Sequence, residues 1–431
     1  MLIIEYCLDD QKVQSSREIG MRKLVSVVIL VGCMAYLAGC GGGSSTTNAV
    51  VTNIDTLTAP IVTLPVAYPA NLGGAYQKGS ALTFHNYSVS TLTGSRAGFG
   101  NHSTSVSPPA KFNRPLAITS DGTNLYVADY LNNVIRKIEI ASGLDRTIAT
   151  VDATTKVAVS FNFPRDITTD GTNIYVADSG NYTIRKIVVS TNAVTGVVTG
   201  EVTTLAGGAG IAGSVDDADG AKARFNIING ITTDGFSLYV TDSNNTIRRI
   251  GLTGLFPVTT LAGSPGTIGS TDGKQGAARF YLPNRITTDG PNLYVTDFNN
   301  STIRKIALAT GEVTTIAGKV GPGGFDGTHA DSTDGTGKTA RFNQPNGITT
   351  DGVNLYVTDS YDNTIRMIVL SPATVYSGPV TTIAGAASGI AGGSKEGIGT
   401  VATFYNPIGI TTDGSSLYIV DSLNHGIRKI Q

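Results

Sequence analysis

Apolar and polar residues recur in the same order six times along the chain. Each copy opens with Phe, then has a short β-prone run, a turn that usually reads T-D-G, an apolar L-Y-V run, a second turn and an I-R-K-I run. The copies begin at Phe112, Phe161, Phe225, Phe280, Phe342 and Phe404. A period of about 50 to 65 residues indicates one supersecondary unit that is repeated.

Each copy predicts four antiparallel strands. In the second copy, residues 166–169, 174–177 and 184–187 are β-prone runs separated by turns rich in Gly and Asn, and 202–207 follows as a fourth strand after a variable linker. Both faces of such a unit are apolar. This pattern is typical of a propeller blade packed between two neighbours.

The count of strands predicts how the ring closes. The sixth copy ends at Gln431 after its third strand, and segment 88–94 before the first copy matches the sequence of the fourth strands. An open ring would leave an unpaired edge. We therefore predict an all-β, six-bladed β-propeller of four-stranded antiparallel blades over 88–431, in which strand 88–94 completes the last blade.

The repeat resembles that of the NHL family. The family pattern is almost whole from Phe342 to Arg366, and the resemblance covers roughly residues 88 to 431. The Gly-rich linkers, such as Gly269 to Phe280, look like those of bacterial NHL propellers and of the teneurin-type subgroup. The chain has no Trp, unlike WD repeats and most kelch blades. The departures are Ile228 in place of Pro, and Ala117, Asp166 and Arg285 in place of Gly.

The first 40 residues predict an exported lipoprotein. A basic start at Met21 precedes an apolar run that is short for a membrane span, and residues 37–40, L-A-G-C, match the bacterial lipobox. We expect residues 1–39 to be a signal region with its true start at Met21, Cys40 to be lipidated, and 40–87 to be a flexible tether. Because Gly41 is not the Asp of inner-membrane retention, an outer-membrane lipoprotein facing the periplasm or the exterior is favoured. An uncleaved membrane anchor is the alternative.

Composition narrows the class of partner. Charged residues make up 15% of the chain and the formal net charge is −1, whereas nucleic-acid binding demands a basic surface. Nucleic acid is therefore excluded as a partner. Cys7 and Cys33 leave with the signal, so a disulfide framework is not expected. We expect a monomer without a cofactor.

Two sets of repeated carboxylates are interpreted as structural. The first Asp of each copy opens a turn, where its side chain caps backbone N–H groups. The second Asp of each copy precedes an Arg by seven residues, or by six in the third copy, which places the two on facing strands. The first set is Asp121, Asp170, Asp234, Asp289, Asp351 and Asp413, and the second is Asp129, Asp178, Asp242, Asp297, Asp359 and Asp421.

Metal binding and catalysis have weak support in the sequence. Asp217, Asp219, Asp331 and Asp334 lie on Gly-rich linkers that can offer oxygens to calcium, but their spacing is not that of an EF-hand and solvated loops are the simpler interpretation. The four His residues are scattered, and no nucleophile motif is present. Amidating lyases and sugar lactonases also use six-bladed propellers, but their metal-binding residues are not recognisable here. No catalytic residue is assigned.

The best candidate for a binding site is one face of the ring. The linkers between blades and the turns between second and third strands emerge together there, and residues that differ between blades gather at the channel mouth. The mouth candidates are Arg165, Asp166, Asn229, Asn284, Arg285 and Asn346, and the turn aromatics are Tyr130, Tyr182, Phe298 and Tyr361. The alternative is that Asp166 and Arg285 merely pair with their neighbours.

Three functions stay open at this point. The leading hypothesis is a non-catalytic propeller that binds a protein, peptide or glycan through its loop face, since a rigid ring with variable loops suits recognition. The second is an extracytoplasmic metal-dependent hydrolase or lyase with its site in the channel. The third is a purely structural surface component. The sequence does not name the ligand.

Overall fold

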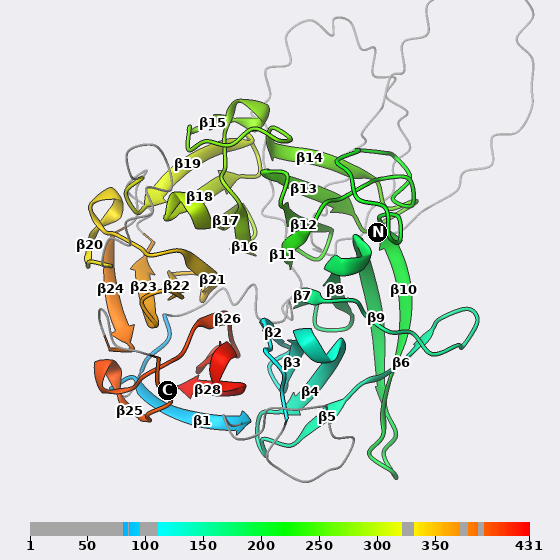
Figure 1. Cartoon of the computed structure of the whole chain (residues 1–431), viewed down its shortest axis with the longest axis horizontal. Coiled ribbons are helices and arrows are strands. Elements are labelled where there is room, and N and C mark those ends of the chain that lie inside the picture. Colours follow the sequence, from blue (N-terminus) through cyan, green and yellow to red (C-terminus); the bar gives the residue numbers. More distant parts are fainter. Residues whose placement is uncertain (1–80, 85, 95–110, 321–331, 371–377, 387–391) are drawn as a thin grey trace, which may run out of the picture. The chain divides into compact units, whose positions relative to one another are not determined.

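Six β-sheets surround a central axis as the blades of a propeller (Figure 1). The structure is a computed structural model that describes residues 81–84, 86–94, 111–320, 332–370, 378–386 and 392–431. These all belong to one unit, Pro65–Gln431. The predictions for residues 1–39, Cys40 and Asp331 lie outside the described residues. No helix in the described ranges is both long enough and apolar enough to cross a membrane.

The first three blades follow one another in chain order. Blade 1 contains β2 (Ala117–Ser120), β3 (Asn124–Asp129), β4 (Val134–Glu139) and β5 (Asp145–Thr147). Blade 2 contains β7 (Pro164–Thr169), β8 (Ile174–Asp178), β9 (Thr183–Thr191) and β10 (Val198–Ala206), with β6 (Ala149–Asp152) beside β10. Blade 3 contains β11 (Ile228–Thr233), β12 (Ser237–Asp242), β13 (Thr246–Gly251) and β14 (Val258–Gly263).

The last three blades each gain a two-residue outer strand from a linker. Blade 4 contains β16 (Pro283–Thr288), β17 (Asn292–Asp297), β18 (Thr302–Ala307), β19 (Glu312–Ala317) and β15 (Gly273–Lys274). Blade 5 contains β21 (Pro345–Thr350), β22 (Asn354–Asp359), β23 (Thr364–Val369), β24 (Pro379–Ala384) and β20 (Gly335–Thr336). Blade 6 contains β26 (Pro407–Thr412), β27 (Leu417–Asp421), β28 (Gly426–Ile430), β1 (Ser88–Gly94) and β25 (Gly397–Ile398).

The two ends of the propeller close the ring as predicted. β1 pairs antiparallel with β28, with Val89 opposite Ile430 and Ser90 opposite Lys429. Ser88 and Gln431 exchange backbone hydrogen bonds of 3.0 and 3.1 Å. In Figure 1 the blue β1 lies along the red β28. Six blades and closure by strand 88–94 are therefore confirmed.

The hydrophobic core lies between neighbouring blades. One cluster joins Tyr175 and Leu205 of blade 2 to Phe225 and Ile231 of blade 3. Another cluster closes the seam between blades 6 and 1. Each sheet buries both faces, so the apolar side chains on the two sides of a strand pack against different neighbouring blades.

The structure departs from four antiparallel strands per blade in two ways. Four blades have a fifth strand, and β6 pairs with β10 in parallel rather than antiparallel orientation. In addition, β9 and β10 are nine residues long each and form a hairpin that extends beyond the other blades (Figure 1). These extensions cover outer edges that would otherwise be unpaired.

Packed residues begin before the predicted first residue of the propeller, 88. Leu82 is buried, and its backbone N–H donates to Asp351 Oδ2 at 2.9 Å. The Phe84 ring contacts the Tyr87 and Tyr356 rings, with centroids 4.9 and 5.9 Å apart. These residues fall in the range 40–87 expected as a tether, yet they contribute to the core between blades 5 and 6.

Candidate binding site at the channel mouth

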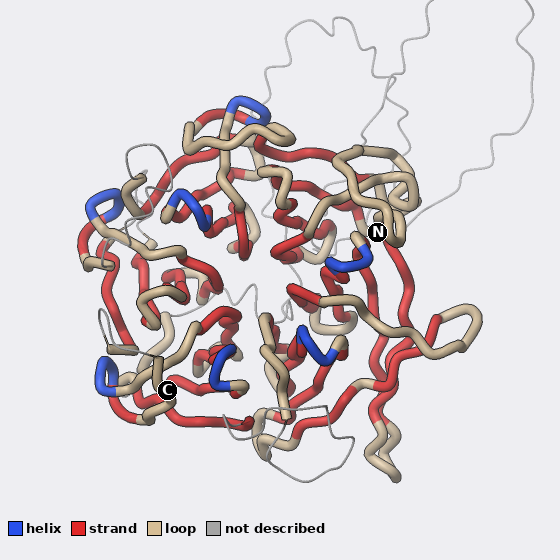
Figure 2. Tube along the Cα trace, in the orientation of Figure 1, coloured by secondary structure: helices blue, strands red, loops and turns tan. Residues whose placement is uncertain are grey.

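The turns between second and third strands lie on the same face as the linkers that enter each blade. The Leu131 N–H donates to the Asn113 carbonyl at 3.1 Å, and the Gly180 N–H donates to the Asn162 carbonyl at 2.8 Å. Four of these turns are 3-10 helices, visible as short blue segments in Figure 2. They are η2 (Tyr130–Asn132), η3 (Ser179–Asn181), η5 (Phe298–Asn300) and η8 (Ser422–Asn424); η4 (Gln275–Ala277), η6 (Gly337–Thr339) and η7 (Gly399–Val401) lie in the linkers.

The second Asp of each copy is fully buried and holds this face together. Asp421 accepts the Tyr405 N–H at 2.7 Å, the Asn424 amide at 2.8 Å and Arg428 Nη1 at 3.0 Å. The Arg428 guanidinium lies over the Phe404 ring, 5.2 Å from its centroid. Burial raises the pKa of Asp421 to about 6, although these donors oppose the shift.

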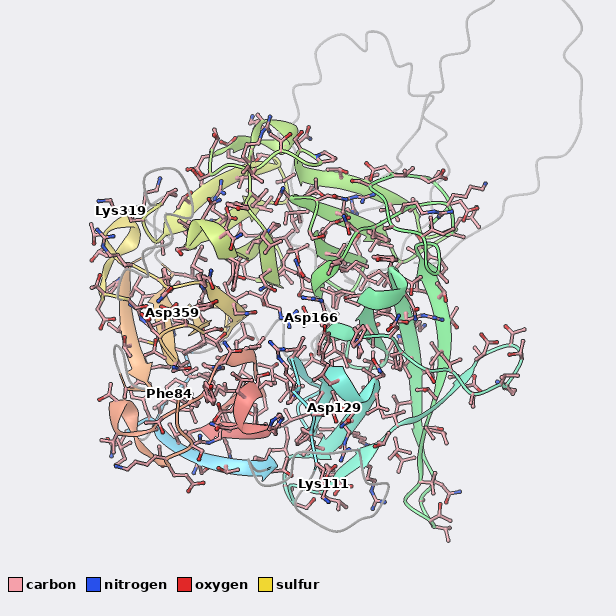
Figure 3. All side chains as sticks on the ribbon, in the orientation of Figure 1. Phe84, Lys111, Asp129, Asp166, Lys319 and Asp359 are labelled. Atoms are coloured by element: carbon pink, nitrogen blue, oxygen red, sulfur yellow. The ribbon has the colours of Figure 1, made fainter. Side chains whose placement is uncertain are left out.

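The Asp–Arg pairs are therefore structural, as predicted. They are buried, however, and so differ from the solvent-exposed ion pairs on a hairpin surface, which contribute little to stability. Equivalent pairs occur in blades 2 to 5 at distances of 2.6 to 3.4 Å. Blade 1 differs, because Arg136 pairs with Asp145 of β5. Figure 3 shows Asp129 and Asp359 inside their blades, away from the ring centre.

The first Asp of each copy caps its turn on the opposite face, as predicted. Asp413 Oδ1 accepts the backbone N–H groups of Ser415 and Ser416, both at 2.8 Å. Its Oδ2 accepts the Tyr418 hydroxyl at 2.8 Å. The same tyrosine contact occurs in the other five blades, so both sets of six carboxylates are used by the scaffold.

The linker carboxylates also have protein partners. Asp334 Oδ1 accepts Arg366 Nη2 at 2.9 Å and the Thr382 hydroxyl at 3.0 Å. Asp217 Oδ1 accepts the Asp219 N–H at 2.8 Å, and Asp219 lies 3.4 Å from the Lys222 ammonium. Within the described ranges, no group of three His, Cys, Asp or Glu side chains is placed to hold a metal ion.

Asp166 and Arg285 meet at the ring centre and are both buried. Arg285 Nη1 lies 3.8 Å from Asp166 Oδ2, and the two side chains are 7% and 9% exposed. Arg285 also donates to the Leu116 carbonyl at 3.0 Å and to the Asn229 carbonyl. Asp166 accepts the Ile231 N–H at 2.7 Å. The figure labels Asp166 near the ring centre (Figure 3).

The first strands of the six blades surround a small cavity beside this pair. All six first strands line a cavity of about 40 Å³, which includes Asp166, Arg285 and a threonine from each blade. A space of this size holds a few water molecules. The Arg285 Nε and the Asn346 Oδ1 are buried without a hydrogen-bond partner among the described residues.

Arg165 has a different environment from Asp166, although the two are adjacent. Its guanidinium lies over the Tyr130 ring, 5.7 Å from the centroid, and Nη1 donates to Asn229 Oδ1 at 3.4 Å. The Phe163 ring packs beside Tyr130 with centroids 5.2 Å apart and an interplanar angle of 37°. We call Tyr130, Phe163 and Arg165 the aromatic platform. Phe163 is 42% exposed.

Phe163 was not among the residues expected at the mouth. It stands two residues after the Phe that opens its copy and has a φ of 49°. The equivalent residues in other blades, also at positive φ, are Arg114, Leu282, Gln344 and Asn406. The signal that was available in the sequence is this variability at a fixed distance from an invariant Phe.

The remaining candidates do not join the platform. Asn284 and Asn346 lie at the inner ends of their strands, where their backbone carbonyls accept the hydroxyls of Thr241 and Thr296 from the preceding blades. Tyr182 occupies the left-handed position that ends η3, Phe298 begins η5, and Tyr361 is 51% exposed. The structure therefore brings together Tyr130, Arg165 and Asn229 on the loop face, and Asp166 with Arg285 below it.

Comparison with known proteins supports the repeat type. No family model matches the chain. A segment of 154 residues is 35% identical to NHL repeat-containing protein 2 of Bos taurus, covering 33% of this chain and 19% of that protein. The human protein of the same name is 34% identical over 143 residues, covering 32% and 18%. The chain thus spans about a fifth of the length of these curated relatives.

Solved structures share the fold at low sequence identity. A protein of unknown function from Bacteroides thetaiotaomicron aligns with a TM-score of 0.57 and 21% identity, covering 80% of this chain and 75% of that one. Auxiliary nutrient binding proteins from Bacteroides ovatus and Bacteroides thetaiotaomicron each align with a TM-score of 0.56 and 18% identity. They cover 81% and 80% of this chain, and 77% and 76% of theirs. At these identities the likeness concerns the fold.

Proposed function

This chain is an NHL-repeat β-propeller, and we propose that it is a non-catalytic binding module held at the bacterial outer membrane by a lipid on Cys40. Its ligand binds on the loop face, at the aromatic platform. The two Bacteroides proteins with this fold that are described as nutrient binding proteins fit such a use.

The observation that carries this proposal is the contrast between repeated and variable residues. The repeated carboxylates accept hydrogen bonds at the turns or pair with arginines inside the blades. The variable residues Tyr130, Phe163 and Arg165 instead form one contiguous cluster that is partly exposed at the mouth. An exposed aromatic cluster beside an arginine is costly to leave in water and is the residue type enriched at binding hot spots.

A binding experiment with the full chain tests the proposal. Arrays of peptides, proteins and oligosaccharides are probed with the wild type and with Phe163→Ala. The matched control is Phe236→Ala, because Phe236 is 54% exposed on a turn between first and second strands, on the opposite face. We expect Phe163→Ala to lose the wild-type ligands and Phe236→Ala to retain them. Equal binding by both variants would exclude this face as the site.

The tether is a separate part of the proposal. The lipobox residues 37–40 and the Gly-rich segment after them support lipidation of Cys40 and attachment by more than one acyl chain. Metabolic labelling with a radioactive fatty acid should mark the wild type and not Cys40→Ser. Fractionation should place the wild type with outer membranes and the variant in the soluble fraction. A labelled Cys40→Ser chain would contradict the assignment of this cysteine.

A further inference from the structure

We propose that the aromatic platform binds a carbohydrate that carries a carboxylate, of the uronic-acid type. The inference rests on the proposed function and names the ligand class of the same site. Two features of the platform lead to it: the packed rings and the positive charge of Arg165 beside them.

The two rings offer an apolar surface suited to a sugar ring. Tyr130 and Phe163 are in contact, with centroids 5.2 Å apart, so they form one surface rather than two walls of a groove. One face of a pyranose ring presents C–H groups, which pack against aromatic faces, while its hydroxyls stay at the rim in reach of polar groups. The Tyr130 hydroxyl and the Arg165 guanidinium supply such groups at the rim, while the buried Asn229 amide holds Arg165 from below.

The charge beside the rings favours an anion. Within the described ranges, Arg165 makes one hydrogen bond, to Asn229 at 3.4 Å, and no ion pair. The nearby Asp166 is buried and is held by Arg285 and the Ile231 N–H. A guanidinium has five N–H donors in a planar fork that matches a carboxylate. Arg165 therefore has donors left for a ligand carboxylate.

Two other cations, Lys111 and Arg114, lie in the linker whose backbone contacts the turn that contains Tyr130. Arg114 and Lys111 are exposed and form no ion pair with any described carboxylate. They flank Asn113, whose carbonyl accepts the N–H of Leu131, the residue after Tyr130. These two cations add positive charge to the loop face, and the Asp129 carboxylate at the base of the turn is buried, where it accepts the Asn113 N–H and the Asn132 amide.

The form of the platform favours a sugar ring over a peptide at this site. Peptides are recognised by pockets for their side chains, by exposed sheet edges or by apolar grooves. Tyr130 and Phe163 pack into a single apolar surface, and neither ring lines the cavity of about 40 Å³ at the ring centre. A ligand on this surface packs against the two rings, which suits a sugar ring better than an extended chain.

Calorimetry with the full chain tests the inference. The probes are a panel of oligouronates, the same oligosaccharides after reduction of their carboxyl groups, and acidic and proline-rich peptides. We expect at least one oligouronate to bind, with affinity at least about tenfold higher than its reduced form, since hydrogen bonds to a charged group are worth about 1.5–3 kcal/mol. Arg165→Gln should remove that preference, whereas Phe163→Ala should weaken binding of both forms.

The other outcomes of this experiment separate a failure of the carboxylate inference from a failure of the proposed function. Equal binding of the acidic and reduced sugars, or no binding by any oligouronate, overturns the carboxylate inference. Binding of a peptide that is lost in Phe163→Ala also overturns it but leaves the proposed function standing. Oligouronate binding that survives Phe163→Ala and Arg165→Gln overturns both, because the ligand then lies elsewhere. Unchanged melting temperatures of both variants show that the exposed substitutions leave the ring folded.

Discussion

Arg285 of blade 4 reaches across the ring centre to Asp166 of blade 2, with Nη1 and Oδ2 3.8 Å apart. The same guanidinium donates to the Leu116 carbonyl at the entry to blade 1, so one side chain links blades that are not neighbours. Elsewhere in the ring this position is Ala or Gly. The pair therefore acts as a strut across the ring centre.

Breaking the strut on one side should destabilise the ring more than removing it. Arg285→Gly leaves the buried Asp166 carboxylate without its cation, and loss of one partner of a buried pair costs about 3–5 kcal/mol. The double variant Asp166→Gly and Arg285→Gly restores the residue found at Gly230, Gly347 and Gly409. It should recover most of the loss. Urea unfolding of the four proteins in this cycle gives the free energies.

Arg165→Gln is the control for this cycle. Arg165 is adjacent to Asp166 but only partly buried, so its substitution should change the free energy of unfolding by less than about 0.5 kcal/mol. A double variant as unstable as Arg285→Gly would show that the two residues contribute independently and that the strut is not a unit.

The repeated arginines should differ in importance according to their contacts. Arg304 is fully buried over Phe280 and donates to Asp297, Asp272 and two backbone carbonyls. Arg185 holds the same position in blade 2, but its side chain is 16% exposed and, among the described residues, donates to Asp178 and Thr204 alone. Lys has no planar fork to satisfy several acceptors. We expect Arg304→Lys to cost about 2–4 kcal/mol and Arg185→Lys about 1 kcal/mol, measured by thermal and urea unfolding. Equal costs would contradict the role of these additional acceptors.

Much of the fold follows from the repeat alone. The six copies fix the number of blades, and the missing fourth strand after Ile430 identifies segment 88–94 as its replacement. The Asp–Arg spacing also places the two residues on facing strands of the second hairpin, where Asp178 lies opposite Thr183 and Arg185 is its diagonal neighbour. These are properties of the local pattern, repeated with little change.

The remaining features depend on contacts that no local pattern specifies. The outer strands β15, β20 and β25 are two residues long and pair through backbone groups, so their side chains give no signal. Phe163 joins the platform because a left-handed residue turns its ring toward Tyr130 of the preceding blade. The reach of Arg285 to Leu116 depends on the width of the closed ring. Each of these features becomes visible only when the tertiary structure is known.

Gly94, the last residue of the closing strand β1, should be sensitive to substitution. Its φ is +85°, and a Cβ there would lie 2.5 Å from the carbonyl oxygen of His425, the residue just before the facing strand β28. Gly122 has a φ of +88° with nothing within 4 Å of such a Cβ. Both Ala variants carry the same backbone strain of about 1–2 kcal/mol. The steric clash should cost Gly94→Ala a further 1–3 kcal/mol, roughly.

The difference between the two variants isolates the closure of the ring. Urea unfolding should give a lower midpoint for Gly94→Ala than for Gly122→Ala, and limited proteolysis should release the segment before residue 94 only in the former. If the midpoints coincide, close packing at β1 and β28 does not hold the ring closed.

The seam between blades 6 and 1 should weaken in acid because it uses a histidine. His425 Nδ1 accepts the Arg114 N–H at 3.1 Å, which only the neutral ring can do. At the equivalent positions Asn133, Asn245 and Asn363 make the same contact to the next blade through their amide oxygens. The three asparagine amides accept this hydrogen bond at every pH, whereas the His425 ring accepts it only when it is neutral.

The direction of the change in stability with pH follows from the pKa of His425, which partial burial lowers from its ordinary value. A lowered pKa in the folded state means that the unfolded chain binds the proton more tightly. The contribution of the neutral ring is then complete above about pH 6.5, the unfolded pKa, and is lost as the pH falls through the folded value. We expect about 0.5–1.5 kcal/mol of destabilisation in acid, the worth of one hydrogen bond. His425→Asn should remove this component from the pH dependence of urea unfolding while keeping the contact, whereas Asn363→His should add a second one. An unchanged pH profile in His425→Asn would show that the seam does not depend on this ring.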